Sequence, residues 1–363
     1  MDIVVLPYRD AYFWNEFGTS VRDLQIIEIL SRSHQVTVIN RPVSIYERFL
    51  NKRKNQSTYK SLDYIEFIDE TSFDVFGPIK GREWTVSCYD DVLEQQLIKV
   101  DSKGKPFIFL DFSPFALPNE IERFDNLIYW YDLIDNFTIH NRFSEQEKRL
   151  VSEKYKFVSA NADYVTAVSE KAITCIKSKN KSVLNNGVYD GEIVDSMTPS
   201  SDFLFDFGFV GFITDKLDVD FINHLAEKYK VGVWGKVFDK ETERKLSPKV
   251  YIGGAFKYSD LSDIISKFRV GLIPYLKDRL HDESPLKMYE YFKYLKPCVA
   301  SINFEINSDY YYNYNDFTLD NMENMLSEAI EKSGDISIRK EIKEDWYLSV
   351  KVKNTLYLMG ILE

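Results

Sequence analysis

A short segment in the second half of the chain places a cation and a carboxylate where a helix begins. Ser284, Pro285, Leu286 and Lys287 follow a polar loop, and Glu290 comes three residues after Lys287. Ser284 is a preferred N-cap residue, and Pro285 suits the first helical turn because its missing N–H is not needed there. The free N–H groups and the dipole at a helix N-terminus favour an anion. The segment therefore predicts a site for a nucleotide diphosphate, with Glu290 near the sugar hydroxyls.

Other glycine and basic residues could contact the same ligand. Gly211 ends an apolar run, and a glycine there lets a backbone or a phosphate approach closely, although many such glycines only turn the chain. Lys216 follows as a second phosphate contact. Arg279, in the loop before Ser284, could close over the diphosphate.

Two aspartates in the first half are candidates for a general base. Asp132 and Asp135 come at the end of an apolar and aromatic run, which predicts that they lie at the end of a strand, near an acceptor hydroxyl. A helix cap or a loop carboxylate is the alternative interpretation. Gly18 and Arg22, after the first predicted strand, are candidates for contact with the acceptor.

These residues belong to a chain in which apolar strands alternate with helices. The pattern predicts an α/β fold with parallel sheets covered on both faces, in which ligands bind beyond the carboxyl ends of the strands. Strands are predicted at 3–6, 36–40, 106–111, 126–131, 164–168, 182–184, 205–210, 231–234, 250–252, 270–274 and 297–301. Helices are predicted at 20–31, with Ser20 and Asp23 as a capping box, and at 144–161, 170–177, 218–229, 259–268 and from 284 onward.

A polar segment at 191–202 interrupts this alternation. It predicts two Rossmann-like domains that face a cleft. The predicted bounds are 1–190 for an acceptor-binding domain, 191–203 for a linker and 204–345 for a nucleotide-sugar-binding domain. Residues 346–363 are predicted to form a C-terminal helix that packs back on the first domain.

Composition narrows the class of protein. A net charge of −11 over 363 residues argues against a nucleic-acid partner, and three cysteines that lie far apart fit a reducing, cytoplasmic setting without a disulfide framework. The chain enters a strand at once, so no signal peptide is expected, and no apolar run is long enough to span a membrane. The segment from Arg48 to Lys60 holds five basic residues and no acid. It predicts either peripheral contact with an anionic membrane, at its inner face, or a solvated loop.

The order of these motifs resembles that of GT-B glycosyltransferases. Pro285-Leu-Lys-Met-Tyr-Glu-Tyr291, followed by Lys296-Pro-Cys-Val-Ala300, is similar to the P-x-K-x-x-E-Y segment and G-K-P-V-V strand of that family. Gly208-Phe-Val-Gly211 resembles its G-x-x-G strand end. Asn186-Gly-Val188 resembles its N-G-V-D segment, with Tyr189 inserted before Asp190. The stretch from Tyr129 to Asp135 resembles its Y-x-x-x-D strand end.

The resemblance implies a retaining, metal-independent transferase that takes its sugar from a nucleotide diphosphate, UDP being favoured over GDP, and needs no cofactor. The acceptor would be a glycan or a lipid-linked saccharide of a bacterial surface polysaccharide such as O-antigen, capsule or teichuronic acid. Glu290 would bind the ribose, and Ser284, Leu286 and Lys287 the diphosphate. Asp282, with Glu283 beside it, stands where many members have a sugar-contacting glutamate. Asp135 would be favoured over Asp132 as base, and Gly235, Gly253 and Tyr258 would line the nucleobase.

Other functions fit the same sequence less well. A sugar-nucleotide epimerase of this architecture needs further acid–base groups, and the four scattered histidines offer few. The altered pair Asp282 and Glu283 would suit a non-catalytic nucleotide-sugar-binding relative. A Rossmann dehydrogenase is disfavoured because no G-x-G-x-x-G follows the first strand.

Overall fold

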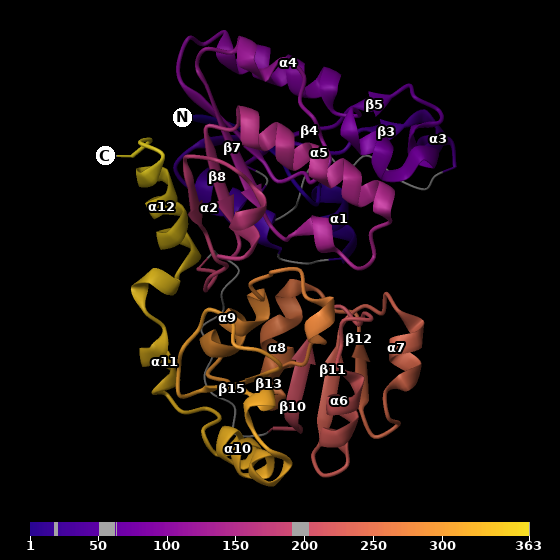
Figure 1. Ribbon diagram of the computed structural model, residues 1–363, viewed down its shortest axis with the longest axis vertical. Helices are drawn as coiled ribbons and strands as arrows, with labels where there is room; N and C mark the ends of the chain where they lie inside the picture. The colour runs from indigo at the N-terminus through magenta and orange to yellow at the C-terminus, as the bar shows by residue number, and fades with distance from the viewer. Residues whose placement is uncertain (18–20, 51–61, 63, 191–202, 363) are drawn as a thin grey trace. The chain divides into compact units, whose positions relative to one another are not determined.

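The computed structural model describes residues 1–17, 21–50, 62, 64–190 and 203–362, which form two α/β units (Figure 1). Unit 1 comprises Met1–Asn185, His281–Glu283 and Val352–Glu363, and unit 2 comprises Asn186–Leu280 and Ser284–Lys351. The predicted linker lies outside the described residues, apart from its last one. The predicted α/β class with two Rossmann-like domains is confirmed, and the residues from Val352 onward belong to unit 1.

Unit 1 is built on a seven-stranded sheet in which every neighbouring pair is parallel. Its order is β4 (Glu66–Ile68), β2 (Gln35–Ile39), β1 (Asp2–Leu6), β6 (Phe107–Asp111), β7 (Leu127–Leu133), β8 (Tyr164–Ala167) and β9 (Lys181–Val183). The strands run outward from β1 in one direction and from β6 in the other. Ligands of such sheets bind at this reversal, beyond the carboxyl ends of the strands.

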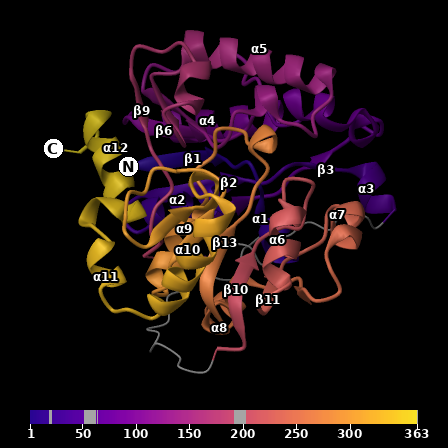
Figure 2. The same ribbon diagram turned by 60° about the horizontal axis from the view of Figure 1, so that its bottom comes forward.

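Helices cover both faces of this sheet because alternate strand residues are apolar on both sides. Helix α4 (Asp90–Asp101) and helix α5 (Glu145–Asn161) share one core cluster with Phe107, Phe109 and Tyr131. Helix α2 (Arg22–Ser31) packs against β2. The C-terminal helix α12 (Leu348–Leu358), whose residues from Val352 belong to this unit, lies beside α2 in Figure 1 and Figure 2.

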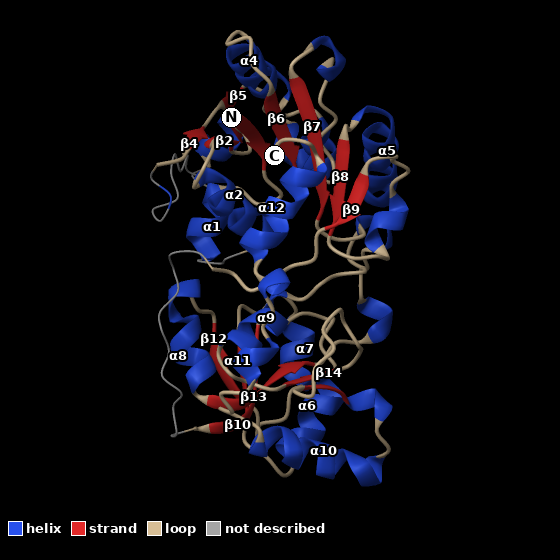
Figure 3. Cartoon of the chain, turned by 90° about the vertical axis from the view of Figure 1, so that its left-hand side faces the viewer, coloured by secondary structure: helices blue, strands red, loops and turns tan. Residues whose placement is uncertain are grey.

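Unit 2 is built on a six-stranded parallel sheet of the same topology. Its order is β12 (Tyr251–Gly254), β11 (Val231–Trp234), β10 (Phe205–Val210), β13 (Phe268–Ile273), β14 (Cys298–Ala300) and β15 (Tyr311–Asn313). Helices α6 (Val219–Ala226) and α10 (Leu319–Glu331) share one core cluster, and α8 (Leu261–Ser266) and α9 (Leu286–Lys293) share another. Figure 3 shows strands and helices in both units.

All eleven predicted strands are present, within a few residues of their predicted bounds, and three predicted helix features are wrong. Helix α2 begins at Arg22 with Val21 as N-cap, in place of the predicted Ser20, which lies outside the described residues. The predicted helix at 170–177 is a short 3-10 helix, Ala172–Cys175. The N-cap of α9 is Pro285, not Ser284. Further elements were not predicted: α1 (Ala11–Phe17), β3 (Val43–Ser44), α3 (Ile45–Phe49), β4, β5 (Thr71–Ser72), α4, α7 (Lys240–Lys245) and β15.

A buried ion pair ties α5 to the end of β6 in unit 1. Lys154 Nζ lies 2.6 Å from Asp111 Oδ2 and 2.5 Å from the carbonyl oxygen of Ala116, and neither charged side chain is exposed. The Tyr129 hydroxyl donates to the same carboxylate at 3.0 Å. Burial lowers the pKa of the Lys154 ammonium, and the Asp111 carboxylate opposes this shift. The two charges can be buried because each is paired with the other and hydrogen-bonded to its neighbours.

We expect Lys154→Met to lower the free energy of unfolding by about 3–5 kcal/mol, because a buried carboxylate is left without its cation. The control is Lys148→Met in the same helix, whose pair with Glu145 is exposed to solvent. It should cost less than about 1 kcal/mol. Urea denaturation at neutral pH measures both. Equal small losses would show that the buried pair does not stabilise unit 1.

Candidate functional site

In unit 2, the backbone just after β10 is in direct contact with the backbone just after β11. A Cβ on Gly235 would lie 1.7 Å from the carbonyl oxygen of Gly211, so any residue other than glycine would clash there. Gly211 itself has a φ of +144°, and a Cβ there would lie 3.1 Å from Cε of Lys287. Gly235 is therefore required for packing, and Gly211 is favoured by its backbone conformation. They also bring the Lys287 ammonium to the carboxyl end of β10.

Basic side chains gather around Tyr275, which follows β13. Lys287 Nζ lies 4.8 Å from the ring centroid and donates to the Tyr275 hydroxyl, and Lys216 Nζ lies 5.4 Å from the same centroid. Arg279 pairs with Asp215, next to Lys216 in the chain, at 3.1 Å. The structure thus brings the predicted diphosphate residues together. Tyr275 was not predicted, although its position just after a strand was a usable signal.

The start of α9 differs in detail from the prediction. The Ser284 hydroxyl donates to the carboxylate of Glu305, which also accepts from the Tyr289 hydroxyl at 2.9 Å. The Ser284 carbonyl accepts from the side-chain amide of Asn186. Because its hydroxyl is taken, Ser284 does not cap the helix. The helix begins at Leu286, and first-turn N–H groups have no acceptor within a helix, so they can face an anion.

Glu290 is a buried carboxylate whose hydrogen bonding is incomplete. Oε1 accepts from the Tyr258 hydroxyl at 2.7 Å. Oε2 has no hydrogen-bond partner in the described part of the chain and lies 4.0 Å from Nζ of Lys293. Burial raises the pKa of the Glu290 carboxyl, and Lys293 and Tyr258 oppose the shift in part. A buried acceptor of this kind suits a ligand that carries hydroxyl groups.

Tyr258 and Gly253, predicted near the nucleobase, have clear structural roles. The Tyr258 hydroxyl is committed to Glu290, and burial raises its pKa, as does the nearby Glu290 carboxylate. A Cβ on Gly253 would lie 2.0 Å from Cδ1 of Trp234, so glycine makes room for that indole. Their contact with a base stays a prediction.

In unit 1, the Asp132 carboxylate near the end of β7 accepts three hydrogen bonds from two residues. Its two oxygens accept from Nε and Nη2 of Arg22, each at 2.8 Å, and Oδ2 also accepts from the Thr166 hydroxyl at 2.6 Å. Both charged side chains are buried. Both oxygens of Asp132 are thus occupied in holding Arg22 and Thr166. Of the two predicted bases, Asp135 is therefore the better candidate. Gly18, the other predicted acceptor contact, lies outside the described residues.

Asn136, which follows Asp135 in the chain, contacts one of the predicted sugar-contacting acids. Asn136 donates from its backbone to the carbonyl of His281 and from its amide to Oδ2 of Asp282, both at 2.9 Å. The Ser169 hydroxyl donates to the Asp282 carbonyl at 2.5 Å. Asp282 has a φ of +61°, rare for a residue with a side chain. These contacts, which were not predicted, hold Asp282 against Asn136 and Ser169 within unit 1.

Glu283, the neighbour of Asp282, is also hydrogen-bonded inside this segment, where its Oε2 accepts from the backbone N–H of His281 at 2.6 Å. The His281 ring stacks on that of His140, with centroids 4.2 Å apart. Backbone, side-chain and ring contacts therefore hold the segment from His281 to Glu283 against Asn136 and His140 within unit 1.

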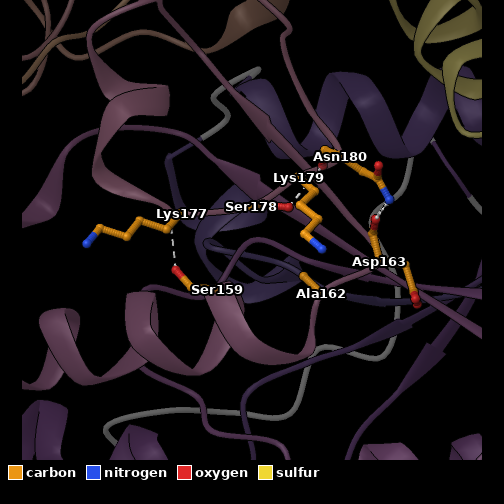
Figure 4. Close-up of a pocket in the computed structure, with 7 residues that line it drawn as sticks. All are labelled: Ser159, Ala162, Asp163, Lys177, Ser178, Lys179 and Asn180. Carbon is orange, nitrogen blue, oxygen red and sulfur yellow. Dashed lines mark hydrogen bonds between the residues drawn. The ribbon is translucent and has the colours of Figure 1, made fainter.

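A surface hollow of about 520 Å³ lies at the opposite edge of the same sheet (Figure 4). Its lining residues stand at the end of α5 and before β8 and β9: Ser159, Ala162, Asp163, Lys177, Ser178, Lys179 and Asn180. This is the amino edge of the strands, away from the predicted site.

No group of three or more potential metal ligands occurs among the described residues. Nor does any helix within those residues have the length and apolar character to cross a bilayer.

The basic segment from Arg48 to Lys60 lies outside the described residues from position 51 onward. Its predicted membrane contact stays a prediction.

The fold was compared with known proteins. No protein-family model and no curated protein sequence matches the chain. The catalytic domain of Starch Synthase IV from Arabidopsis thaliana, bound to ADP and acarbose, is similar in structure, with a TM-score of 0.65 at 11% identity over 99% of this chain and 98% of that one. OtsA in its apo form gives a TM-score of 0.60 at 13% identity, with 100% of both chains covered. The chain has the GT-B fold.

A third GT-B structure is that of S. aureus TarM in complex with fondaparinux, alpha-GlcNAc-glycerol and UDP. Its TM-score is 0.52 at 13% identity, and the match covers 73% of this chain but only 58% of TarM. At these identities the likeness establishes the fold, and the chemistry has to be argued from the residues.

We expect Glu290→Gln to raise the melting temperature, and more so as the pH rises. The pKa of the Glu290 carboxyl is higher in the folded protein than in the unfolded chain. As the pH rises from the unfolded pKa through the folded pKa, the unfolded chain loses this proton first, so the free energy of unfolding falls. Glutamine keeps the acceptor for Tyr258 and does not titrate. Melting curves from about pH 4 to about pH 9 test this. The exposed Glu331→Gln is the control, and a pH-independent difference would contradict the shift.

Proposed function

We propose that this chain is a nucleotide-sugar-dependent glycosyltransferase. It moves a sugar from a UDP- or GDP-sugar, UDP favoured, to a glycan or lipid-linked saccharide of a bacterial surface polysaccharide such as O-antigen, capsule or teichuronic acid. The observation that carries the proposal is the convergence of Lys216 and Lys287 on Tyr275, beside Gly211, with the incompletely bonded Glu290 one turn along the same helix.

The donor is bound by unit 2. Its diphosphate lies against Lys287 and the N–H groups at the start of α9, and Glu290 accepts hydroxyl groups of the ribose. Fixed donors and cations stabilise the negative charge that grows on the departing diphosphate. Lys216 and Arg279 supply further positive charge opposite the diphosphate. The transfer therefore needs no metal ion to stabilise the leaving group. TarM with UDP and Starch Synthase IV with ADP show that this fold accommodates nucleoside diphosphates.

The transfer breaks the bond between the anomeric carbon and the diphosphate oxygen and forms a bond from that carbon to the acceptor oxygen. The acceptor hydroxyl gives its proton to Asp135, whose neighbour Asn136 holds Asp282 in place. Asp282 and Glu283 contact the sugar hydroxyls. As the sequence resemblance implies, the new bond forms on the face from which the diphosphate leaves, so the anomeric configuration is retained.

We expect Lys287→Met to weaken UDP binding about 10- to 100-fold, because a charge-assisted contact with the diphosphate is lost. Thermal-shift titrations with UDP, GDP and TDP measure the effect and fix the base. The control is Lys249→Met, which removes an equal charge from an exposed pair with Glu227. If Lys287→Met and Lys249→Met bind UDP equally well, the diphosphate does not lie at α9.

We expect Asp135→Asn to lower turnover about 10²- to 10⁴-fold while UDP binding is unchanged, because only the proton acceptor is lost. UDP released from a panel of UDP-sugars with saccharide acceptors measures turnover. Asp125→Asn, an exposed aspartate of the same unit, is the control. Full turnover of Asp135→Asn would refute the base. A new sugar nucleotide formed without any acceptor would indicate an epimerase instead.

A further inference from the structure

The loop that follows β1 carries an arginine between two aromatic rings. The chain reads Pro7-Tyr8-Arg9-Asp10 where a dinucleotide-binding fold would have its glycine-rich turn. Cζ of Arg9 lies 4.4 Å from the ring centroid of Tyr8 and 4.5 Å from that of Phe13. Such rings attract the cation and hold it in place, but they offer it no carboxylate or carbonyl oxygen.

The Arg9 guanidinium, which is half-buried, has few acceptors of its own. Nη2 donates to the Tyr8 hydroxyl at 3.2 Å. Among the residues that the structure describes, this is the one hydrogen bond of the Arg9 side chain, and it forms no ion pair with them. A guanidinium is always charged and has five N–H donors, so most of its donors remain for a ligand.

Two acids close to Arg9 bind backbone groups. Asp23 Oδ2 accepts from the backbone N–H of Arg9 at 2.8 Å, and its Oδ1 accepts from that of Leu24 at 2.9 Å. Asp10 Oδ1 accepts from the N–H of Phe13 at 3.2 Å. Burial raises the pKa of the Asp23 carboxyl to about 6, although the backbone donors and the Arg9 charge oppose the shift. These carboxyl groups therefore fix the path of the loop.

Arg9 stands at the edge of unit 1 where a ligand is expected. It is the third residue after β1, and the strand order reverses between β1 and β6. The Tyr8 ring lies 5.2 Å from that of Phe137, whose backbone N–H donates to the carbonyl of Asp135 at 3.0 Å. Tyr8 thus connects Arg9 to the segment that carries the proposed base.

We propose that Arg9 binds an anionic group of the acceptor, a carboxylate or a phosphate. The planar guanidinium can donate two parallel hydrogen bonds to two oxygens of either group. The acceptor is then an acidic sugar or a sugar phosphate, and a neutral glycan is disfavoured. The inference rests on the proposed function in calling this ligand an acceptor. Binding of the anion to unit 1 does not depend on transfer.

The test is a ligand-observed NMR titration of the full chain, with UDP present, against glucuronic acid, N-acetylglucosamine 1-phosphate and methyl glucoside. We expect one of the two anionic probes to bind about tenfold more tightly than the neutral methyl glucoside. Added salt should reduce this advantage. The better of the two anionic probes identifies the group as a carboxylate or a phosphate.

Arg9→Met should weaken binding of the better anionic probe about 10- to 100-fold and leave methyl glucoside unaffected. Methionine can keep the contact with both rings, so this variant should melt close to the wild type. Arg9→Lys keeps the charge without the planar fork and should lose less affinity. The matched control is Arg149→Met, which removes an equal charge from the exposed face of α5 and should bind as the wild type does.

The proposal is overturned if the three probes bind equally or not at all, or if Arg9→Met binds the anionic probe as tightly as Arg149→Met. It is also overturned if Arg9→Met weakens UDP binding as Lys287→Met is expected to do, because Arg9 would then serve the donor. UDP titration of the same samples separates the two proposals. A chain that binds UDP but neither anionic probe refutes the role of Arg9 alone, and one that binds an anionic probe but no nucleotide refutes the donor site alone.

Discussion

Both sheets are covered on both faces, and this constraint decides where the chain can place polar chemistry. Every central strand is buried on its two sides, so its polar neighbours are confined to strand ends and to the helices that follow. In unit 2 the consequence is a set of glycines, lysines and one tyrosine after β10 and β13. In unit 1 it is Arg22 at the start of α2, Asp132 near the end of β7 and Asp135 just after β7. The same parallel topology produces both groups.

Buried charges in the two units differ in how completely they are paired, and this separates structural roles from binding roles. Lys154 and Asp111 satisfy each other and their neighbours, and Asp132 is satisfied by Arg22 and Thr166. Glu290 keeps one oxygen without a hydrogen bond inside the described chain, and burial raises the pKa of its carboxyl. A buried acceptor that lacks a partner suits a ligand that can donate to it, whereas the two ion pairs are satisfied within the protein.

The sequence by itself determined the alternation of strands and helices, the parallel α/β class, the helix that carries Lys287 and Glu290, and the glycines at the strand ends. These are local properties, set by periodicity and by residues within one or two turns. Tertiary structure alone decided that Ser284 gives its hydroxyl to Glu305, that Tyr275 gathers two lysines and that Asp282 is fixed by Asn136. The partners of Ser284 and Asp282 lie 21 and 146 residues away in the chain. No local preference encodes such partners, because they are chosen by how the sheets and helices pack.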